Sequence, residues 1–517
     1  MATINQINDA LRQQLQTIDS HFTVDSTYTT WVDFKCGNLH FNTNQQNISI
    51  NNKSISGNLI SALRFEKNGS GSANSFTLTA YYAPTEADDP NVIDNAISGT
   101  LASAMTSCMI QFGYSFSGQL VSSATYIGSI FDYSVEVQNN MLVYTFTGYS
   151  NAAAHSGFTF DLPAITEKTD IKSIIDKALL ECYRETILDK FDKDKVVTAV
   201  IHNGVRNYSD TIRTALNELK EAKEETLANC PIEVTYDDTV NTRCAKMTFG
   251  GASDVNFFEF LDELLGCARD DYSKDMIDLQ NNKVTHFGEY YYIVQDTGKS
   301  VTDKIKIKIC RREVYPTVYN SSYTFYWGAA FNKNSGCNLV QNFRTEYKGA
   351  INLAINNAGQ TTSYSIDEDG NLVATMTGTN GSSTASTVMP NDIARNNNQY
   401  INGLQYSYKA TLTTLGVPFD IPIGTYITIN CVIGNQKHHT SGVYMVIGTE
   451  DNISTNGFIT TWSLIKMCDS SGNTDNKLSD IAAACLAYAY ADNPNEKKEY
   501  IITHSNKTIN NTIASEY

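Results

Sequence analysis

The stretch YIGSIFDYSVEVQNNMLVYTFTGY, residues 126–149, decides the fold class of this chain. In its second half Leu142, Tyr144 and Phe146 alternate with the more polar residues between them. A period of two is the pattern of a strand that is buried on one face. The turn at 138–140 is short enough for an antiparallel hairpin. The stretch therefore predicts two paired strands, 126–137 and 141–149.

The sequence before this hairpin predicts more strands and one helix. Phe76 and Leu78 alternate with threonines in NSFTLTAY, residues 74–81, as in a half-buried strand. Residues 91–105 carry an apolar residue at every fourth position, which predicts a helix. A short amphipathic segment comes first, with apolar residues at Ile4, Ile7, Leu11 and Leu15. We expect residues 1–160 to form a first tube-like β-barrel whose sheet encloses one helix.

A second set of strands lies in the last third of the chain. LQYSYKATL, residues 404–412, alternates most strongly, and strands are predicted at 425–432, 442–447 and 458–466. Evenly spaced antiparallel strands indicate a barrel or a sandwich. We expect a second barrel over 286–469, with an exposed insertion or mobile loop at 355–400, where Gly, Ser, Thr and Asn dominate.

Helical periodicity dominates only between the two strand sets. Helices are predicted at 169–191, with Thr169 as N-cap, at 209–229, and after Ser253. The last of them is expected to bury Phe257, Phe258, Leu261, Leu264 and Leu265. Residues 161–285 thus form a helix-rich middle domain, and 470–517 form a C-terminal helix (478–490) and a tail. The fold class is mainly β (α+β), with two antiparallel barrels.

The composition excludes several classes of protein. The chain has 517 residues, 41% of them hydrophobic and 18% charged, with a net charge of −17. Disorder over most of the chain is therefore excluded. No run approaches the ~20 apolar residues that span a bilayer, and no secretory pattern opens the chain, so we expect a soluble protein without membrane insertion. The 11 cysteines are scattered without a CxxC pair, which favours free thiols and a reducing cytoplasm over a zinc site.

The one sizeable positive cluster is the row Lys304, Lys306 and Lys308, with Arg311 and Arg312 beyond it. A nucleic-acid footprint would need a basic field around it, whereas the chain is strongly acidic. We interpret the row as solvated or as protecting a strand edge.

Other candidates for chemistry have simpler interpretations. His438 and His439, near Cys431, are neighbours on the chain and cannot both ligate one ion from a regular strand, so a loop tip is expected. The acidic pairs and triplets at 237–238 and 367–369 are expected in solvated turns, and Gly250-Gly251 in the entry turn of a helix. GxSxG, GxxxxGK[ST] and HExxH motifs are absent from the sequence. We expect no catalytic, cofactor-binding or metal-binding residues, no cofactor and no enzymatic activity.

The strand sets resemble a known family. CMIQFGY at 108–114 and the two strands of the 126–150 hairpin look like the first tube-like barrel of baseplate hub proteins from contractile-tailed phages and related injection systems. YTFYWG at 323–328 with FRTEYKG at 343–349, followed by GVPFDIPIGTYI, SGVYMV and NGFITTWSLI at 416–427, 441–446 and 456–465, is similar to the second barrel. The middle segment matches no motif of the family.

The resemblance implies a structural role. Three copies would form a ring of six barrels that adapts the hexameric tail tube to the trimeric central spike, with DNA passing through the lumen without specific binding. Other expected partners are baseplate wedge and tape measure proteins, in a virion tail assembled in the host bacterial cytoplasm. Carboxylates lining the channel would repel DNA. The alternatives are a distal tail or tube-end protein that forms hexamers, a β-rich receptor-binding protein, and, third, an enzyme acting on carbohydrate.

Overall fold

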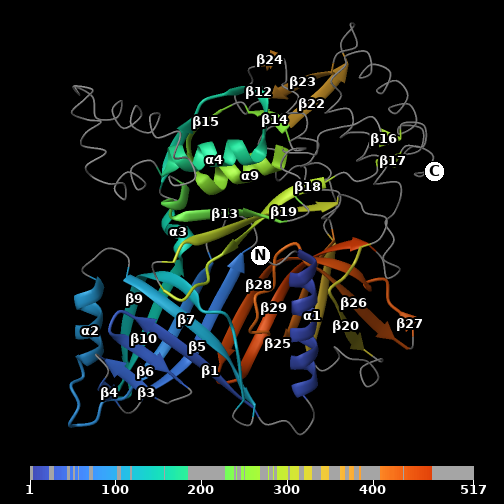
Figure 1. Ribbon diagram of the computed structural model, residues 1–517. Helices are drawn as coiled ribbons and strands as arrows, with labels where there is room; N and C mark the ends of the chain where they lie inside the picture. The colour runs from blue at the N-terminus through green and yellow to red at the C-terminus, as the bar shows by residue number, and fades with distance from the viewer. Residues whose placement is uncertain are drawn as a thin grey trace, which may run out of the picture.

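Strands from both ends of the chain form one large, mainly antiparallel sheet of 17 strands. The computed structural model describes residues 4–183 and 227–347 with short gaps, together with 361–366, 372–377, 383–385 and most of 408–468. The large sheet occupies one end of the molecule, and a smaller α/β unit lies beyond it (Figure 1). The expected mainly β fold class is confirmed.

The first barrel has the ladder order β4-β3-β2-β1-β7-β9-β10-β6-β5, and the short strand β8 also pairs with β7. The ladder curls on itself, because Phe34 and Phe41 of the β1–β2 side contact the ring of Phe146 of β10 inside it. The strand bounds are β1 (Tyr28–Cys36), β2 (Leu39–Asn42), β3 (Asn47–Ile50), β4 (Lys53–Ile55), β5 (Asn58–Asn68), β6 (Ser75–Tyr82), β7 (Thr106–Phe116), β8 (Gln119–Ser122), β9 (Tyr126–Gln138) and β10 (Met141–Ser150).

The predicted hairpin is present as β9 and β10. Its turn residues Asn139 and Asn140 have φ values of 47° and 64°, which asparagine tolerates better than most residues. The predicted helix is shorter than 91–105: it is α2 (Val92–Leu101). Ile93 of α2 is fully buried, and Tyr144 of β10 donates a hydrogen bond to Asp94 over 2.7 Å. Helix α2 is thereby fastened to the barrel wall.

The second barrel has the ladder order β20-β26-β28-β29-β25-β21, and its two end strands lie near each other without pairing in the described residues. Only the β20–β26 pair is parallel. The bounds are β20 (Tyr323–Gly328), β21 (Val340–Tyr347), β25 (Tyr408–Leu415), β26 (Tyr426–Ile433), β27 (Gln436–Lys437), β28 (Gly442–Ser454) and β29 (Gly457–Cys468). Strand β28 runs seven residues beyond the predicted end at 447.

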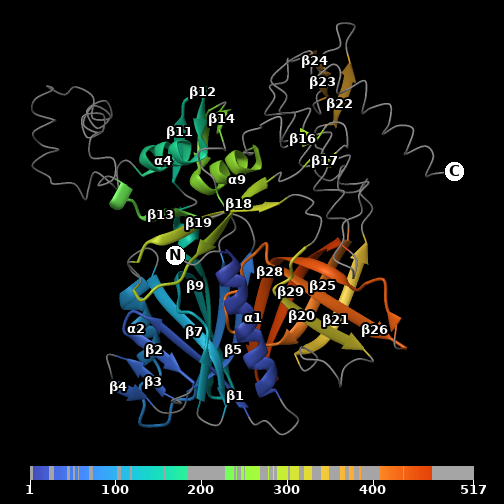
Figure 2. The same cartoon turned by 45° about the vertical axis from the view of Figure 1, so that its right-hand side comes forward.

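The N-terminal amphipathic segment is helix α1 (Ile4–His21), which lies over the junction of the two barrels (Figure 2). Phe22, the residue that follows α1, packs edge-to-face on Tyr114 and Phe116 of the first barrel. Arg12 Nε donates a hydrogen bond over 2.7 Å to the carbonyl oxygen of Ser322, which precedes β20 of the second barrel. Helix α1 therefore fastens both barrels on one side.

The middle unit packs helices α4 (Ile171–Cys182) and α9 (Phe257–Cys267) with a three-stranded sheet in the order β13-β19-β18. The remaining bounds are α3 (Asn151–His155), β11 (Thr159–Leu162), β12 (Ile165–Asp170), β13 (Ile232–Tyr236), β14 (Lys246–Phe249), β15 (Ala252–Asn256), β16 (Ile277–Asp278), β17 (Lys283–Val284), β18 (Gly288–Gln295) and β19 (Ile305–Glu313).

Two expectations for this unit are corrected and a third is confirmed. Strands β18 and β19 share its core, so the boundary expected at 285/286 cuts through it; the second barrel begins with β20. The N-cap of α4 is Asp170 rather than Thr169, because the Asp170 carboxylate accepts the amide hydrogen of Ser173. The predicted burial of the last helix is correct for Phe257, Phe258, Leu261, Leu264 and Leu265, and Phe260 joins them.

The insertion at 355–400 contains regular structure, contrary to the loop expected there. Strands β22 (Thr361–Ile366), β23 (Leu372–Thr377) and β24 (Ser383–Ala385) form an antiparallel sheet away from both barrels (Figure 1). The predicted helix at 478–490 and most of that at 209–229 lie outside the described residues. In the described part of the chain, no helix is both long and apolar enough to cross a bilayer.

Candidate functional site

The two barrels are joined by a strand pair. Strand β5 of the first barrel pairs antiparallel with β28 of the second, with Leu63 opposite Ile453 and Asn68 opposite Gly448. A single eight-stranded antiparallel sheet therefore runs through both barrels in the order β9-β10-β6-β5-β28-β29-β25-β21. Each barrel contributes four strands. We call this the shared sheet.

The outer face of the shared sheet is mostly polar, with one exposed aromatic pair, Phe131 and Tyr149, on β9 and β10. Polar residues lie opposite one another on neighbouring strands of this face in both barrels. For example, Thr413 lies opposite Thr461, Thr461 opposite Glu450, and Glu450 opposite Glu66. Seven threonines of four strands lie on this face, at 77, 79, 145, 147, 411, 413 and 461. The opposite face carries the core residues of both barrels. This polar, β-branched surface suits a solvated strand face.

Charges on the outer face are largely paired. Arg64 Nε donates to Glu450 Oε1 over 3.0 Å and its guanidinium also contacts Glu66, so one arginine links the two barrels. These hydrogen bonds and charges raise the pKa of Arg64. Arg344 and Glu346 form a similar pair at 3.1 Å near the far edge of the sheet. The acidic residues of this face are Glu66, Asp132, Glu136, Glu346 and Glu450, and the basic ones are Arg64, Arg344 and Lys409.

Beneath the sheet, a buried ion pair crosses the junction. Lys67 of β5 and Asp451 of β28 are both nearly inaccessible, and Nζ lies 3.2 Å from Oδ2. Burial raises the pKa of Asp451, while Lys67 and the hydroxyl of Thr460, which donates over 2.6 Å, act in the opposite direction. Asp420 lies 3.7 Å from Lys67 and accepts a 2.6 Å hydrogen bond from Tyr126 of the first barrel. The ammonium group thus neutralises carboxylates of the second barrel.

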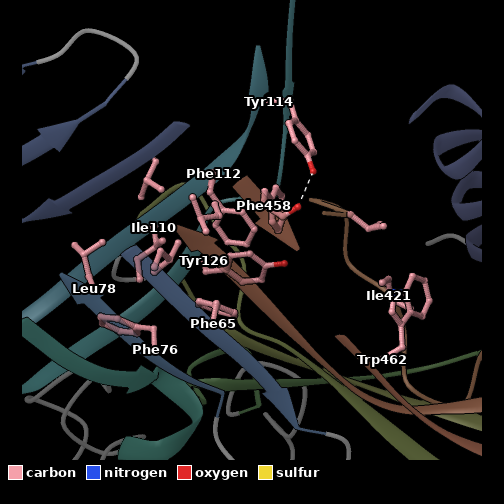
Figure 3. Packing of buried hydrophobic residues seen from close by; sticks show 14 of the residues in the cluster. Phe65, Phe76, Leu78, Ile110, Phe112, Tyr114, Tyr126, Ile421, Phe458 and Trp462 are labelled. Carbon is pink, nitrogen blue, oxygen red and sulfur yellow. Dashed lines mark hydrogen bonds between the residues drawn. The ribbon is translucent and has the colours of Figure 1, made fainter. Parts of the chain in front are cut away.

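The apolar core is also continuous across the junction. Phe458 of β29 packs on the rings of Phe112 and Tyr114 of β7, and Tyr114 donates a hydrogen bond to the Phe458 carbonyl oxygen over 3.2 Å (Figure 3). One cluster of buried side chains includes both barrels and α1. The two barrels are therefore packed as one body, since separating them would expose aromatic rings and a buried charge pair.

The strands of one half of the shared sheet correspond to those of the other. Five strands of the first barrel have counterparts in the second, with the same order along the chain and the same pairing. In order, β5, β6, β7, β9 and β10 correspond to β21, β25, β26, β28 and β29. The irregularities coincide too: β5 has a bulge between Ile60 and Ala62, and β21 has one between Val340 and Asn342. The hairpins β9–β10 and β28–β29 each have a bulge in their first strand. It lies at residue 131 of β9 and at residue 447 of β28, in both cases seven residues before the last paired residue of that strand.

The correspondence extends to side chains. Arg64 lies opposite Thr77, and Arg344 lies opposite Thr411. Each arginine is followed two residues later by a glutamate with which it pairs. Each threonine opens a Thr-Leu-Thr run, at 77–79 and 411–413. These short matches are the sequence signal for the two-fold repetition, and an inspection for a repeat of fixed period misses them.

The structure changes the interpretation of the lysine row. Strand β19 lies between β13 and β18, so it is not an edge strand. Lys308 is buried and forms a 2.9 Å ion pair with Asp237, which is also buried and not in a solvated turn. The edge-protection interpretation is therefore wrong. Lys306 is exposed, as the solvated interpretation predicts, whereas the Lys308–Asp237 pair belongs to the core of the middle unit.

The remaining candidates show no constellation for chemistry. His438 and His439 lie in the turn between β27 and β28, as expected, and the described residues contain no group of three metal-ligating side chains. Gly251 has a φ of 94° and precedes strand β15, so it is not the entry turn of α9, which begins only at Phe257. Asp238, Gly250 and residues 367–369 lie outside the described residues. Seven cysteines in the described part are free and buried, at 36, 108, 182, 230, 310, 431 and 468.

Comparison with known proteins gives matches only among solved structures. No family model and no curated protein matches the chain. A tail protein from Neisseria meningitidis aligns over 86% of this chain and 99% of its own length, with 9% identity and a TM-score of 0.41. A 43 kDa tail protein of a Shewanella oneidensis prophage aligns over 85% and 98%, with 10% identity and a TM-score of 0.41. A component of the Escherichia coli type VI secretion system aligns over 80% and 76%, with 8% identity and a TM-score of 0.35.

Identities and TM-scores of this size leave the role of the chain to be inferred from its own geometry. Solved structures to which this chain is similar thus include two tail proteins and a type VI secretion component.

Proposed function

We propose that this protein is the structural hub of a phage or phage-like tail, in which three copies form a ring and their shared sheets line a central channel. The observation that carries the proposal is the eight-stranded sheet to which two corresponding barrels contribute four strands each. Three chains with two barrels each would present six similar units to a hexameric tube while keeping threefold symmetry for a trimeric spike. Such an adaptor uses interfaces and needs no catalytic group.

The polar face supports the assignment of the channel wall. Helix α1 contacts β20, and Phe22 beside it packs on residues of β1 and β7. None of these strands belongs to the shared sheet, so α1 covers the opposite side of the junction. A ring with the shared sheet inward would have threonines, mostly paired charges and the Phe131–Tyr149 pair along the bore, with α1 outside. An acidic excess on this face would keep DNA from adhering as it passes.

The subunit count tests the proposal. Full-length protein should sediment as a trimer of 57.2 kDa chains, alone or after the trimeric spike protein of the same particle is added. A hexamer would favour a distal tail or tube-end protein instead, and a monomer in both conditions would contradict the ring.

A further inference from the structure

We infer that β21 of one copy pairs with β9 of the next copy, in the register that β5 and β28 use within the chain. The inference rests on the proposed ring and names the strands, the register and the contacting side chains of its subunit interface. It follows from three observations: two strand edges that are open, the correspondence of each open strand with a strand of the internal junction, and complementary residues at the predicted contact.

Both edges of the shared sheet are open in the described part of the chain. Strand β7 pairs with β9 only over residues 126–130, so residues 131–138 of β9 have β10 as their one paired strand. Strand β21 likewise pairs only with β25. Open edges of this length recruit another strand unless they are blocked. The β9 edge carries exposed apolar side chains, since Val137 is 74% exposed and Val135 38% exposed on it.

The strand correspondence supplies the register. Strand β9 corresponds to β28 and β21 corresponds to β5, with Gln138 matching Ser454 at the hairpin turns and Arg344 matching Arg64 at the bulges. Within the chain Arg64 lies opposite Asn452, and Leu63 opposite Ile453. Transferring this pairing to two copies puts Arg344 opposite Glu136 of the next copy and Phe343 opposite Val137 of the next copy.

The residues that would meet are complementary. Arg344 is 74% exposed, and Glu136 is exposed on the same outer face of the sheet. Opposite charges on directly paired residues stabilise two strands. On the inner face, Val137 would lie against Phe343, which is partly buried beside Tyr444. The interface between copies would thus be apolar inside, as it is at the corresponding Leu63–Ile453 pair of the internal junction, and ionic outside.

The partner is a second copy because the contact is head-to-tail. One chain offers a β21 edge and a β9 edge at opposite ends of its shared sheet. A contact between two different edges of identical chains repeats from copy to copy, and it closes into a ring when the rotation permits. The internal junction already makes the same kind of turn from barrel to barrel, so the external contact continues it.

Cysteine cross-linking in the full-length protein tests the register. The variant Glu136→Cys/Arg344→Cys, oxidised with diamide, should give covalent dimers and trimers on a non-reducing gel. The matched control Asp132→Cys/Arg344→Cys moves one thiol four residues along β9, roughly 13 Å at 3.3 Å per residue, and should give none. Unmodified protein controls for the native cysteines, and each single substitution should also stay uncross-linked.

Charge reversal gives a second readout. Arg344→Glu and Glu136→Arg should each raise the dissociation constant of the assembly about five-fold, and the two substitutions together should restore it to within about two-fold. A trimer by sedimentation whose thiols at 136 and 344 stay unlinked, or link only in the 132 control, would overturn the register while leaving the ring intact. Protein that remains monomeric under all conditions would contradict the ring itself, and the proposed function with it.

Discussion

Removing the ammonium group at the junction of the barrels should loosen that junction specifically. In a Lys67→Met variant the apolar stem of the side chain is kept, but Asp451 loses the cation 3.2 Å away. Asp451 is 1% exposed and retains only the hydroxyl of Thr460 as a close donor, whereas Asp420 is about half exposed and can be hydrated. Breaking a buried pair by removing one partner costs about 3–5 kcal/mol.

Hydrogen exchange of the backbone amides in 63–68 and 448–453 measures this effect. A loss of about 3 kcal/mol of local opening free energy makes exchange through that opening roughly 100-fold faster. The neutral double variant Lys67→Met/Asp451→Asn keeps an acceptor for Thr460 and should recover to within about 1 kcal/mol of the native protein. Lys409→Met, on the outer face of the same sheet, is the matched control and should change stability by less than about 0.5 kcal/mol.

The reasoning would be refuted by either of two results. Unchanged exchange in Lys67→Met would mean that the ion pair does not hold the strands together. A double variant as unstable as the single one would mean that the cost comes from lost packing of the lysine stem rather than from a stranded charge.

Three further predictions concern the first barrel and its contact with the middle unit. Burial raises the pKa of Asp296 to about 6, so the folded state holds this proton more tightly than the unfolded state, and the stabilisation is lost as the pH rises from about 4 through 6. Asp296→Asn should therefore increase the free energy of unfolding at pH 8 more than at pH 5, by about 1–2 kcal/mol; a pH-independent difference argues against it. Gly148→Ala should lower stability by about 1–3 kcal/mol in denaturant titration, because its Cβ would lie 2.2 Å from the Phe76 ring. Asn140→Val should melt below the native protein and Asn140→Gly should not, because φ is 64° there; equal melting would contradict the turn geometry.

Local patterns allowed strand β6 and the β9–β10 hairpin of the first barrel to be predicted. Phe76 and Leu78 are buried as expected, and β10 matches its predicted limits to one residue. A strand with one buried face carries this information in its own alternation. What such a pattern does not carry is the element against which the face packs. Ile305, Ile307 and Ile309 alternate strongly, but they face the helices of the middle unit rather than the second barrel.

The junction was not predictable from local patterns. The sequence TEDNIS at 449–454 resembles a polar loop, yet it is the end of β28 that pairs with the first barrel. Asp451 becomes a buried residue only because Lys67, nearly 400 positions earlier, neutralises it. The repetition of the strands was hidden for a related reason. Arg64 and Arg344 are 280 positions apart and Thr77 and Thr411 are 334 apart, because the insertion separates β21 from β25.

Cryo-electron microscopy of the assembled full-length protein tests the central claim most directly. The account predicts three chains per ring, six barrels around one axis, and a bore lined by the outer face of the shared sheet, with Arg64, Thr77 and Thr411 at its wall and α1 outside. A ring of six chains, or a bore lined by α1 instead of the shared sheet, would contradict it.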